Sequence, residues 1–320
     1  MPSPQFIQLH RIDDGILADE ASAGLRARPA WLSPKFFYDA LGSRLFDAIT
    51  ELAEYYPTRT EAAIFDAQGP AIAAAVLAAT GARPVLVDLG AGNCAKAARL
   101  FGALAPRRYV AVDISVDFLR QSLQQLQREH PALDMLGIGL DFSTRLQLPV
   151  DVINGPALVF YPGSSIGNFA PADALRLLRE AREVAAGGAL LIGVDRVKPC
   201  AVLEAAYDDD LGVTAAFNLN LLKHLNRLLG ADFEVRDWRH VALFDAAQSR
   251  IEMHLEARTA VTVRWPQGER HFAAGERMHT ENSYKWTPEA FEALLREAGF
   301  SQVRQWSDER GWFSVVLAAG

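Results

Sequence analysis

The chain has 320 residues, more than the roughly 100 to 200 residues of one typical domain, so a large core or two units can form. Hydrophobic residues make up 50% and charged residues 22%, which excludes a disordered chain, a coiled coil and a collagen-like fibre. The net charge is -7 and the basic residues are scattered, which argues against a nucleic-acid partner or a membrane-surface partner.

Cysteine content and the start of the chain bear on the compartment. Cys94 and Cys200 are too few for a disulfide framework, and their spacing matches no metal motif. The first residues lack the basic segment and apolar run of a signal peptide, and no stretch is expected to reach the roughly 18 apolar residues of a membrane span. The nearest stretch, 71–79, is predicted to be a buried helix. We therefore expect a cytoplasmic protein without a membrane partner.

Residues 34–80 have a helical pattern, which we expect to be divided near Pro57 because proline interrupts a helix. A short apolar run at 84–88 then ends in a glycine-rich turn, and the Ala- and Leu-rich stretch 95–104 has helical spacing. This order predicts a strand, a tight turn and a helix.

The alternation of strands and helices continues along the chain. Strands are predicted at 109–113, 135–140, 157–161 and 189–195, and helices at 116–129 and 171–185. Continuous apolar strands separated by helices indicate a parallel sheet with both faces covered. The predicted fold class is therefore α/β, a doubly wound sheet that binds its ligand at the carboxyl ends of the strands.

Residues 196–286 interrupt this rhythm. They are predicted to contain two polar-faced helices within 201–229 and then strands near 241–245, 251–264 and 276–283. A helix at 288–298 and strands at 303–307 and 313–318 resume the α/β pattern. We therefore divide the chain into an N-terminal helical part of the second domain, the first part of the α/β domain, an inserted subdomain and a last helix with two strands, at 1–60, 61–195, 196–286 and 287–320.

The segment DLGAGN at 88–93 follows the first of these apolar strands directly. Its glycines let a ligand approach the backbone at a helix N-terminus. The stretch 90–95 also fits the loose fingerprint of nicotinamide enzymes, so the turn alone does not separate a dinucleotide from a nucleoside. Asp88 favours a cationic ligand over a pyrophosphate, because opposite charges attract at close range. S-adenosylmethionine carries a sulfonium and an ammonium and no phosphate.

Two further acidic residues follow predicted strands. Asp113 could accept both hydroxyls of a ribose, and Asp141 could accept the amino group of an adenine whose base lies against Phe142. Three strand ends would then hold three successive parts of one ligand. The alternative is that these acids only cap the helices that follow them.

Six more segments carry a more specific pattern. They are FYD at 37–39, EYYPTR at 54–59, SSIGNF at 164–169, AYD at 206–208, IEM at 251–253 and ENSYK at 281–285. In order and spacing they resemble the histidine-specific α-N-methyltransferases of ergothioneine biosynthesis, from about Leu32 to the end of the chain. The resemblance implies a Rossmann-like, class I S-adenosylmethionine-dependent methyltransferase with an additional substrate-binding subdomain. Such an enzyme converts L-histidine to its trimethylbetaine, hercynine, in three methylations.

The resemblance also implies the roles of individual residues. Asn168 and Tyr207 would hold the carboxylate of the substrate, and Tyr56, Glu281 and Ser283 would hold its imidazole. The residues implied along the cofactor are Tyr38, Gly90, Lys96, Asp113, Asp141 and Phe142, to which the glycine turn adds Asp88 and Gly92.

The chemistry of amine methylation agrees with these roles. The amine must be neutral and its lone pair must lie in line with the breaking bond, so positioning, which can contribute roughly 7 to 11 kcal/mol, is the main resource. Tyr38 and Tyr56 are the candidate catalytic residues, as hydrogen-bond acceptors or proton relays. Glu281 and Ser283, two residues apart on an extended segment, point to the same face and could both reach one imidazole. They are predicted to set the preference for histidine.

Several alternatives stay open in the sequence. Asn168 could cap the helix that begins near Pro171, and Met253 could line the substrate pocket or only fill the core. Tyr161 and Pro162 stand where the family pattern leads us to expect a small or aliphatic residue and a glycine, which bears on the seat of Asn168.

Three other functions are compatible with the fold. They are an N-methyltransferase for another amino acid or amine, a nicotinamide oxidoreductase and a non-catalytic S-adenosylmethionine-binding protein. The seven histidines show no paired spacing with cysteine or carboxylate, so we expect no metal. A monomer that binds L-histidine as a small-molecule substrate is the expected state.

Overall fold

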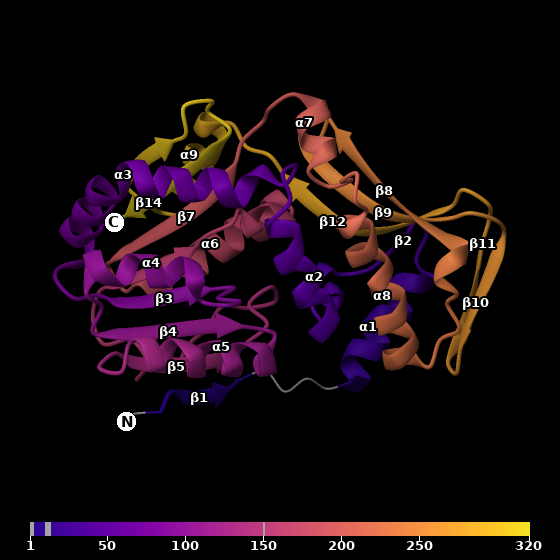
Figure 1. The fold of residues 1–320 in the computed structure, drawn as a ribbon, viewed down its shortest axis with the longest axis horizontal. Helices are drawn as coiled ribbons and strands as arrows, with labels where there is room; N and C mark the ends of the chain where they lie inside the picture. Colours follow the sequence, from indigo (N-terminus) through magenta and orange to yellow (C-terminus); the bar gives the residue numbers. More distant parts are fainter. Residues whose placement is uncertain (1–2, 10–13, 150) are drawn as a thin grey trace. The chain divides into compact units, whose positions relative to one another are not determined.

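Residues 3–9, 14–149 and 151–320 are described by the structure, a computed structural model. The chain forms two units, which are described separately (Figure 1). Unit 1 contains Met1–His10, Pro57–Val197 and Lys285–Gly320, and unit 2 contains Arg11–Tyr56 and Lys198–Tyr284. The chain crosses from one unit to the other at 56–57, 197–198 and 284–285, close to the boundaries that the sequence analysis places at 60, 195 and 286. Part of the chain start that we judged for a signal peptide, residues 1–2 and 10–13, lies outside the described residues.

The sheet of unit 1 has the order β1-β5-β4-β3-β6-β7-β14-β13 among the described residues. Its strands are β1 (Gln5–Gln8), β3 (Val85–Leu89), β4 (Arg108–Asp113), β5 (Asp134–Gly139), β6 (Ala157–Tyr161), β7 (Ala189–Asp195), β13 (Gln302–Ser307) and β14 (Phe313–Ala319). The strand order reverses between β3 and β6, which is the arrangement of a doubly wound α/β sheet. The predicted fold class is confirmed, and the reversal marks the expected place of a ligand.

Two features of this sheet differ from the prediction. Strand β14 runs antiparallel to both β7 and β13, because β13 and β14 are joined by a short turn rather than by a crossover helix. Strand β1 pairs with β5 in parallel, although residues 1–60 were assigned to the second domain as a helical part. Its side chains Phe6 and Ile7 pack against opposite core layers of unit 1. Four residues are too few to show a strand period in the sequence.

Helices cover both faces of the sheet. One face packs against α3 (Tyr56–Thr80), α4 (Ala95–Leu104) and α5 (Val116–Glu129), and the other against α6 (Pro171–Ala185) and α9 (Pro288–Glu297). Along β4, Tyr109 and Ala111 face the first layer while Val110 and Val112 face the second. This alternation inside the apolar centre of the strand gives three layers, with helices on both faces of the sheet.

Helix α3 is long and apolar enough to cross a membrane by length and composition, with a mean hydropathy of 1.5 over 18 residues. The expectation that no stretch approaches a membrane span is therefore wrong for α3. Core helices of globular proteins pass the same test. Here Ile64, Ile72 and Val76 pack into the core of unit 1, while Ala74 and Ala78 are exposed. The helix thus covers the sheet with one side only.

Unit 2 combines helices with a small mixed sheet. Its helices are α1 (Asp14–Arg26), η1 (Pro34–Phe37), α2 (Ala40–Thr50), α7 (Cys200–Ala205), α8 (Val213–Leu229) and η3 (Val235–Asp237). Its sheet has the order β2-β12-β9-β8, formed by β2 (Ala30–Trp31), β12 (Arg277–Tyr284), β9 (Arg250–Ala257) and β8 (Trp238–Asp245). A separate hairpin is formed by β10 (Val261–Trp265) and β11 (Gly268–Phe272).

The sequence describes unit 2 less well than unit 1. The single strand expected over 251–264 is two strands, β9 and β10, separated by a turn. The helix expected to be polar-faced, α8, buries Phe217, Leu221 and Leu225, together with Asn218 and Asn220. Because two asparagines lie among the buried apolar residues, the sequence of this face has the pattern of a polar, exposed one.

Candidate active site

The glycine turn after β3 lies against the end of β4, at the point where the strand order reverses. Gly90 and Gly92 have φ values of +68° and +51°, in the left-handed region that favours glycine. The backbone N–H of Gly90 donates to the carbonyl of Val112 at 2.9 Å, and that of Gly92 donates to Oδ2 of Asp113 at 2.9 Å. The turn and the predicted ribose acceptor are therefore one hydrogen-bonded unit.

The predicted ribose and adenine acceptors, Asp113 and Asp141, also make local hydrogen bonds. Oδ1 of Asp113 accepts from the N–H of Ser115 at 2.8 Å, and burial raises the pKa of this carboxyl against the opposing effect of its backbone donors. The buried Asp141 accepts from the N–H of Ser143 at 3.0 Å and from its hydroxyl. These local bonds are not helix caps, because the N-caps of α4 and α5 are Cys94 and Ser115 and no helix lies between Asp141 and β6 among the described residues, so the capping alternative is wrong. A carboxylate can accept about four hydrogen bonds, so these contacts do not exclude a ligand.

Phe142 lies beside the glycine turn and is supported from behind by β6. A Cβ atom on Gly90 would lie 3.9 Å from the tip of the Phe142 ring. The ring of Tyr161 meets that of Phe142 edge-on, with centroids 5.8 Å apart and planes at 90°. Tyr161, one of the two residues that depart from the family pattern, thus supports the ring of Phe142, against which the adenine base is predicted to lie.

Asp88 is buried at the end of β3. The hydroxyl of Tyr109 donates to its Oδ2 at 2.7 Å, whereas Oδ1 has no hydrogen-bond partner among the described residues. Burial raises the pKa of Asp88 to about 7, so its negative charge is partly lost at neutral pH. Burial and the nearby Asp88 together raise the pKa of the Cys94 thiol to about 12, so that thiol is not an activated nucleophile. An ionic contact of Asp88 with a cationic ligand stays a prediction.

Lys96 is paired with Glu61, a residue outside the predicted site. Its Nζ lies 2.8 Å from Oε2 of Glu61 on α3, and Oε1 of Glu61 accepts from the N–H of Gly163 at 2.8 Å. A Cβ atom on Gly193 of β7 would lie 2.2 Å from Oε1 of Glu61, so glycine makes room for the carboxylate. The only sequence signal for Glu61 is a carboxylate on the apolar side of a long helix.

The loop after β6 carries Asn168 at the end of η2 (Ser165–Asn168). Ser164 adopts a left-handed conformation, and its Oγ accepts from the N–H of Asp195 at 2.8 Å. The side chain of Asp195 forms an ion pair with Lys285, Nζ to Oδ2 2.8 Å, in which both side chains are buried. The N-cap of α6 is Ala170, without a side-chain cap, so the alternative that Asn168 caps this helix is wrong.

In unit 2, Tyr38 is placed by aromatic neighbours and by the cap of α2. Its ring lies 5.9 Å from those of Phe46 and Phe217, in edge-on contacts. The next residue, Asp39, accepts from the N–H of Gly42 at 2.7 Å as the N-cap of α2. Asp39 also accepts from Nδ2 of Asn220 at 2.8 Å and from Arg227, both on α8. Tyr38 is therefore held by its own ring contacts and by the hydrogen bonds of the residue that follows it.

The predicted substrate residues of β12 lie together. Glu281 and Ser283 share one face of the strand and are buried, with Met253 of β9 paired directly opposite Glu281. The hydroxyl of Tyr207 lies 2.7 Å from Oγ of Ser283 in a hydrogen bond. The structure therefore brings these four predicted residues into one cluster of unit 2.

His240 holds the segment of Tyr207 and was not selected from the sequence. Its Nε2 lies 2.7 Å from the carbonyl of Tyr207, which can only accept, so Nε2 carries the hydrogen. Its Nδ1 then accepts from Nδ2 of Asn218 at 2.8 Å. Burial lowers the pKa of His240, in keeping with a neutral ring. This neutral histidine fixes the backbone from which the tyrosine projects.

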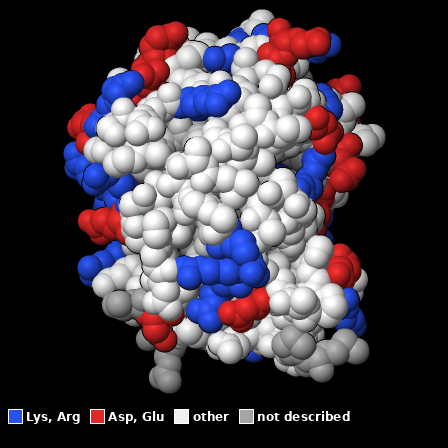
Figure 2. Space-filling view, turned by 90° about the vertical axis from the view of Figure 1, so that its left-hand side faces the viewer, with Lys and Arg blue, Asp and Glu red and all other residues white. Residues whose placement is uncertain are grey.

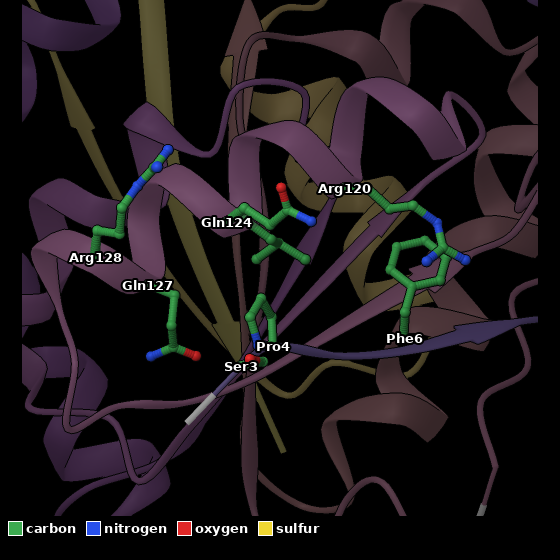
Figure 3. A pocket seen from close by; sticks show the side chains of 8 residues that line it. Ser3, Pro4, Phe6, Arg120, Gln124, Gln127 and Arg128 are labelled. Carbon is green, nitrogen blue, oxygen red and sulfur yellow. The ribbon is translucent and has the colours of Figure 1, made fainter. Parts of the chain in front are cut away.

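The surface grooves of unit 1 include one predicted residue. A groove lined by Leu9, Leu140, Asp141, Thr144, Arg145, Gln147, Leu148 and Pro149 contains the predicted adenine acceptor. A second groove beside β1 and α5, where Arg120 stacks over Phe6 at 3.9 Å, contains no predicted site residue (Figure 3). Figure 2 shows a face whose middle is largely uncharged, with basic side chains in its upper part, a larger basic group beside acidic atoms in its lower part, and other charged side chains toward the margin. Within the described ranges, no three His, Cys, Asp or Glu residues are grouped to hold a metal ion.

Residues 17–320 match the family described as histidine-specific methyltransferase, SAM-dependent. The chain belongs to this family. It is therefore a methyltransferase that uses S-adenosylmethionine, as the resemblance in the sequence indicated. The nicotinamide oxidoreductase and the non-catalytic binding protein are no longer alternatives.

Relatives of this methyltransferase match over most of its length. The protein named histidine N-alpha-methyltransferase from Mycolicibacterium smegmatis is 43% identical over 309 residues, which are 94% of this chain and 94% of that protein. The protein of the same name from Mycobacterium tuberculosis is 41% identical over 311 residues, 95% of this chain and 94% of that protein. Ergothioneine biosynthesis protein 1 from Neurospora crassa is 30% identical over 289 residues, 87% of this chain and 32% of that protein.

The strand ends of this methyltransferase fit S-adenosylmethionine. The two glycines of the turn leave its backbone open to a ligand, and the carboxylates of Asp113 and Asp141 are acceptors suited to hydroxyl and amino groups. The supported ring of Phe142 offers a flat apolar surface for a base. The ammonium of Lys96 is a donor suited to a carboxylate. Together, the carboxylate acceptors, the aromatic ring and the ammonium donor match the ribose, adenine and amino-acid parts of S-adenosylmethionine.

Proposed function

We propose that this methyltransferase transfers three methyl groups in succession to the α-amine of L-histidine and forms hercynine, a step of ergothioneine biosynthesis. The observation that carries the proposal is the buried cluster on β12, where Glu281 and Ser283 share a face beside Tyr207 and Met253. The names of the mycobacterial and Neurospora relatives support the substrate and the pathway.

The roles in the cofactor half follow from the chemistry of each side chain. Asp113 accepts the ribose hydroxyls, Asp141 accepts the adenine amino group, and Phe142 stacks against the base. Lys96, held by Glu61, donates to the carboxylate of the amino-acid part. When bound, S-adenosylmethionine supplies a methyl group made electrophilic by a positive sulfur.

The roles in the substrate half depend on the complementarity of an imidazole with its partners. The carboxylate of Glu281 accepts from one ring N–H, and the hydroxyl of Ser283 meets the other nitrogen. Asn168 and Tyr207 hold the carboxylate of histidine, and Met253 forms an apolar wall. Because Tyr207 and Ser283 are hydrogen-bonded to each other, the carboxylate and imidazole subsites are linked through two hydroxyls.

Methyl transfer itself requires little besides position. With S-adenosylmethionine bound, the amine lone pair would form the new N–C bond as the C–S bond breaks, and the electrons of the broken bond would remain on sulfur. A proton must leave the amine before each attack, first from the α-ammonium of histidine and then from the ammonium that each of the first two transfers forms. Tyr38 and Tyr56 are the candidate relays for these protons, and the contact of the Tyr56 oxygen with Lys198 favours Tyr38. We further propose that the enzyme acts as a cytoplasmic monomer, which sedimentation analysis and subcellular fractionation can test.

Mass spectrometry after incubation with S-adenosylmethionine and an equimolar pool of amino acids tests the proposal. Accumulation of trimethylated histidine alone would support both the acceptor and the extent of methylation. Methylation of another amine, or arrest at monomethylhistidine or dimethylhistidine, would contradict it.

A variant pair tests the carrying observation. In Glu281→Ala with Ser283→Ala, the imidazole loses its polar partners, and we expect selectivity for histidine over other amino acids to fall by a factor of 100 or more. Asn282→Ala is the matched control, because Asn282 lies between them on the opposite face of β12. Unchanged selectivity in the double variant would refute the assignment.

A further inference from the structure

A buried lysine contacts one of the predicted imidazole residues. Nζ of Lys198 lies 2.7 Å from the hydroxyl oxygen of Tyr56 and 4.3 Å from the centroid of its ring. The two residues are 8% and 1% exposed, and both belong to unit 2. Neither the glycine turn nor the six family segments include Lys198.

The chemistry of this contact fixes the direction of the hydrogen bond. A lysine ammonium has three donors and no acceptor, so Lys198 must donate and the oxygen of Tyr56 must accept. The phenolic hydrogen is thereby directed away from the ammonium. The nearby positive charge also polarises the O–H bond, which makes the hydroxyl a stronger donor.

A histidine side chain needs two different partners when it is neutral. One ring nitrogen carries a hydrogen and requires an acceptor, and the other carries a lone pair and requires a donor. Glu281 supplies a carboxylate, which is an acceptor when ionised. The other nitrogen requires a donor, and a Tyr56 hydroxyl that is held as a donor supplies one beside the hydroxyl of Ser283. The imidazolium form, with two N–H groups, would leave that donor facing another donor.

We infer that Lys198 is a positioning residue that fixes the hydroxyl of Tyr56 as a hydrogen-bond donor, so that the site binds the neutral imidazole of its substrate. This inference rests on histidine being the substrate, as proposed above. It assigns to Lys198 an effect on substrate binding that acts through Tyr56.

A double-variant cycle tests whether Lys198 acts through the tyrosine. Lys198→Met keeps the length of the stem and removes the donor, and we expect KM for histidine to rise about tenfold with kcat and KM for S-adenosylmethionine within about twofold. Lys198→Arg retains a cationic donor, and its KM should stay within about threefold of the parent. In the Tyr56→Phe background, Lys198→Met should have no further effect on KM.

Two results of this cycle would overturn the inference. One is a fall in kcat with an unchanged KM for histidine, and the other is an equal rise in KM whether or not the Tyr56 hydroxyl is present. Melting temperature and S-adenosylmethionine affinity, measured on each variant, identify a variant that has lost its fold.

A measurement on the unaltered enzyme tests the inference without any variant. Nitrogen-15 NMR of labelled L-histidine bound together with S-adenosylhomocysteine should show one protonated ring nitrogen and one hydrogen-bonded, unprotonated nitrogen. Two protonated nitrogens in the bound ring would overturn the inference. If the amino-acid pool shows a different acceptor, the proposed function fails, and that result is read from the pool and not from this spectrum.

Discussion

Replacement of Lys285 by methionine tests the buried ion pair at the end of β7. Nζ of Lys285 lies 2.8 Å from Oδ2 of Asp195, and the two side chains are 0% and 1% exposed. Methionine retains most of the apolar stem but removes the charge, so the carboxylate of Asp195 stays buried without this partner. Breaking a buried pair costs about 3 to 5 kcal/mol, and we expect a loss of this size in the free energy of unfolding.

A surface pair of the same unit provides the control. Arg99 lies 2.5 Å from Asp66, but the side chains are 46% and 68% exposed, so Arg99→Met should cost less than about 1 kcal/mol. Adding Asp195→Asn to Lys285→Met removes the uncompensated charge and should recover part of the loss. The assay is urea unfolding followed by circular dichroism and tryptophan fluorescence, whose transitions must coincide for a two-state fit. If Lys285→Met lost no more stability than Arg99→Met, the reasoning would be refuted.

Three further predictions concern the two halves of the site. Glu61→Gln removes the charge that holds Lys96 and should raise the Kd for S-adenosylmethionine about tenfold in calorimetry. Asp88 has a folded pKa of about 7 against an ordinary value of 3.8, so between these values the folded state holds a proton that the unfolded state releases. As pH falls from 7 toward 4, the unfolding free energy of the parent should therefore rise relative to Asp88→Asn, by at most about 1.4 kcal/mol per pH unit. Tyr207→Phe removes a hydroxyl of the substrate cluster and should raise KM for histidine about tenfold in steady-state kinetics while KM for S-adenosylmethionine is unchanged.

Each of these has a result that would contradict it. For Glu61 it is an unchanged cofactor affinity, with Asp66→Asn on the exposed side of α3 as the control. For Asp88 it is a stability difference that does not vary between pH 7 and pH 5 in urea unfolding. For Tyr207 it is a change in both Michaelis constants of equal size, which would indicate a general loss of structure.

Local patterns in the sequence were sufficient for the centre of unit 1. The run 84–88 and the glycines that follow predict β3 and its turn, because burial on both faces and positive φ values leave direct marks on composition. The reversed direction of β14 left no such mark. Whether two strands are joined by a turn or by a crossover is decided by long-range pairing, which an apolar run does not encode.

The partners of the site residues were harder to predict than the residues themselves. Glu61 lies 35 positions before Lys96, and Lys198 lies 142 positions after Tyr56, so neither pair falls within a motif. In the sequence, Tyr161 differs from the family pattern without a visible role, whereas in the structure its ring supports Phe142. A residue that acts by supporting another is recognised from contacts, which appear only when the chain is folded.

The glycine at position 193 has a consequence for the divergence of such enzymes. A side chain there would occupy the space of the Glu61 carboxylate, since its first carbon would fall 2.2 Å from Oε1. A side chain at residue 193 therefore requires either that the Glu61 carboxylate leaves its contact with Gly163 or that residue 61 becomes shorter. Positions 61 and 193 should change as a coupled pair, and a designer who alters the cofactor preference through Lys96 must treat all three positions as one choice.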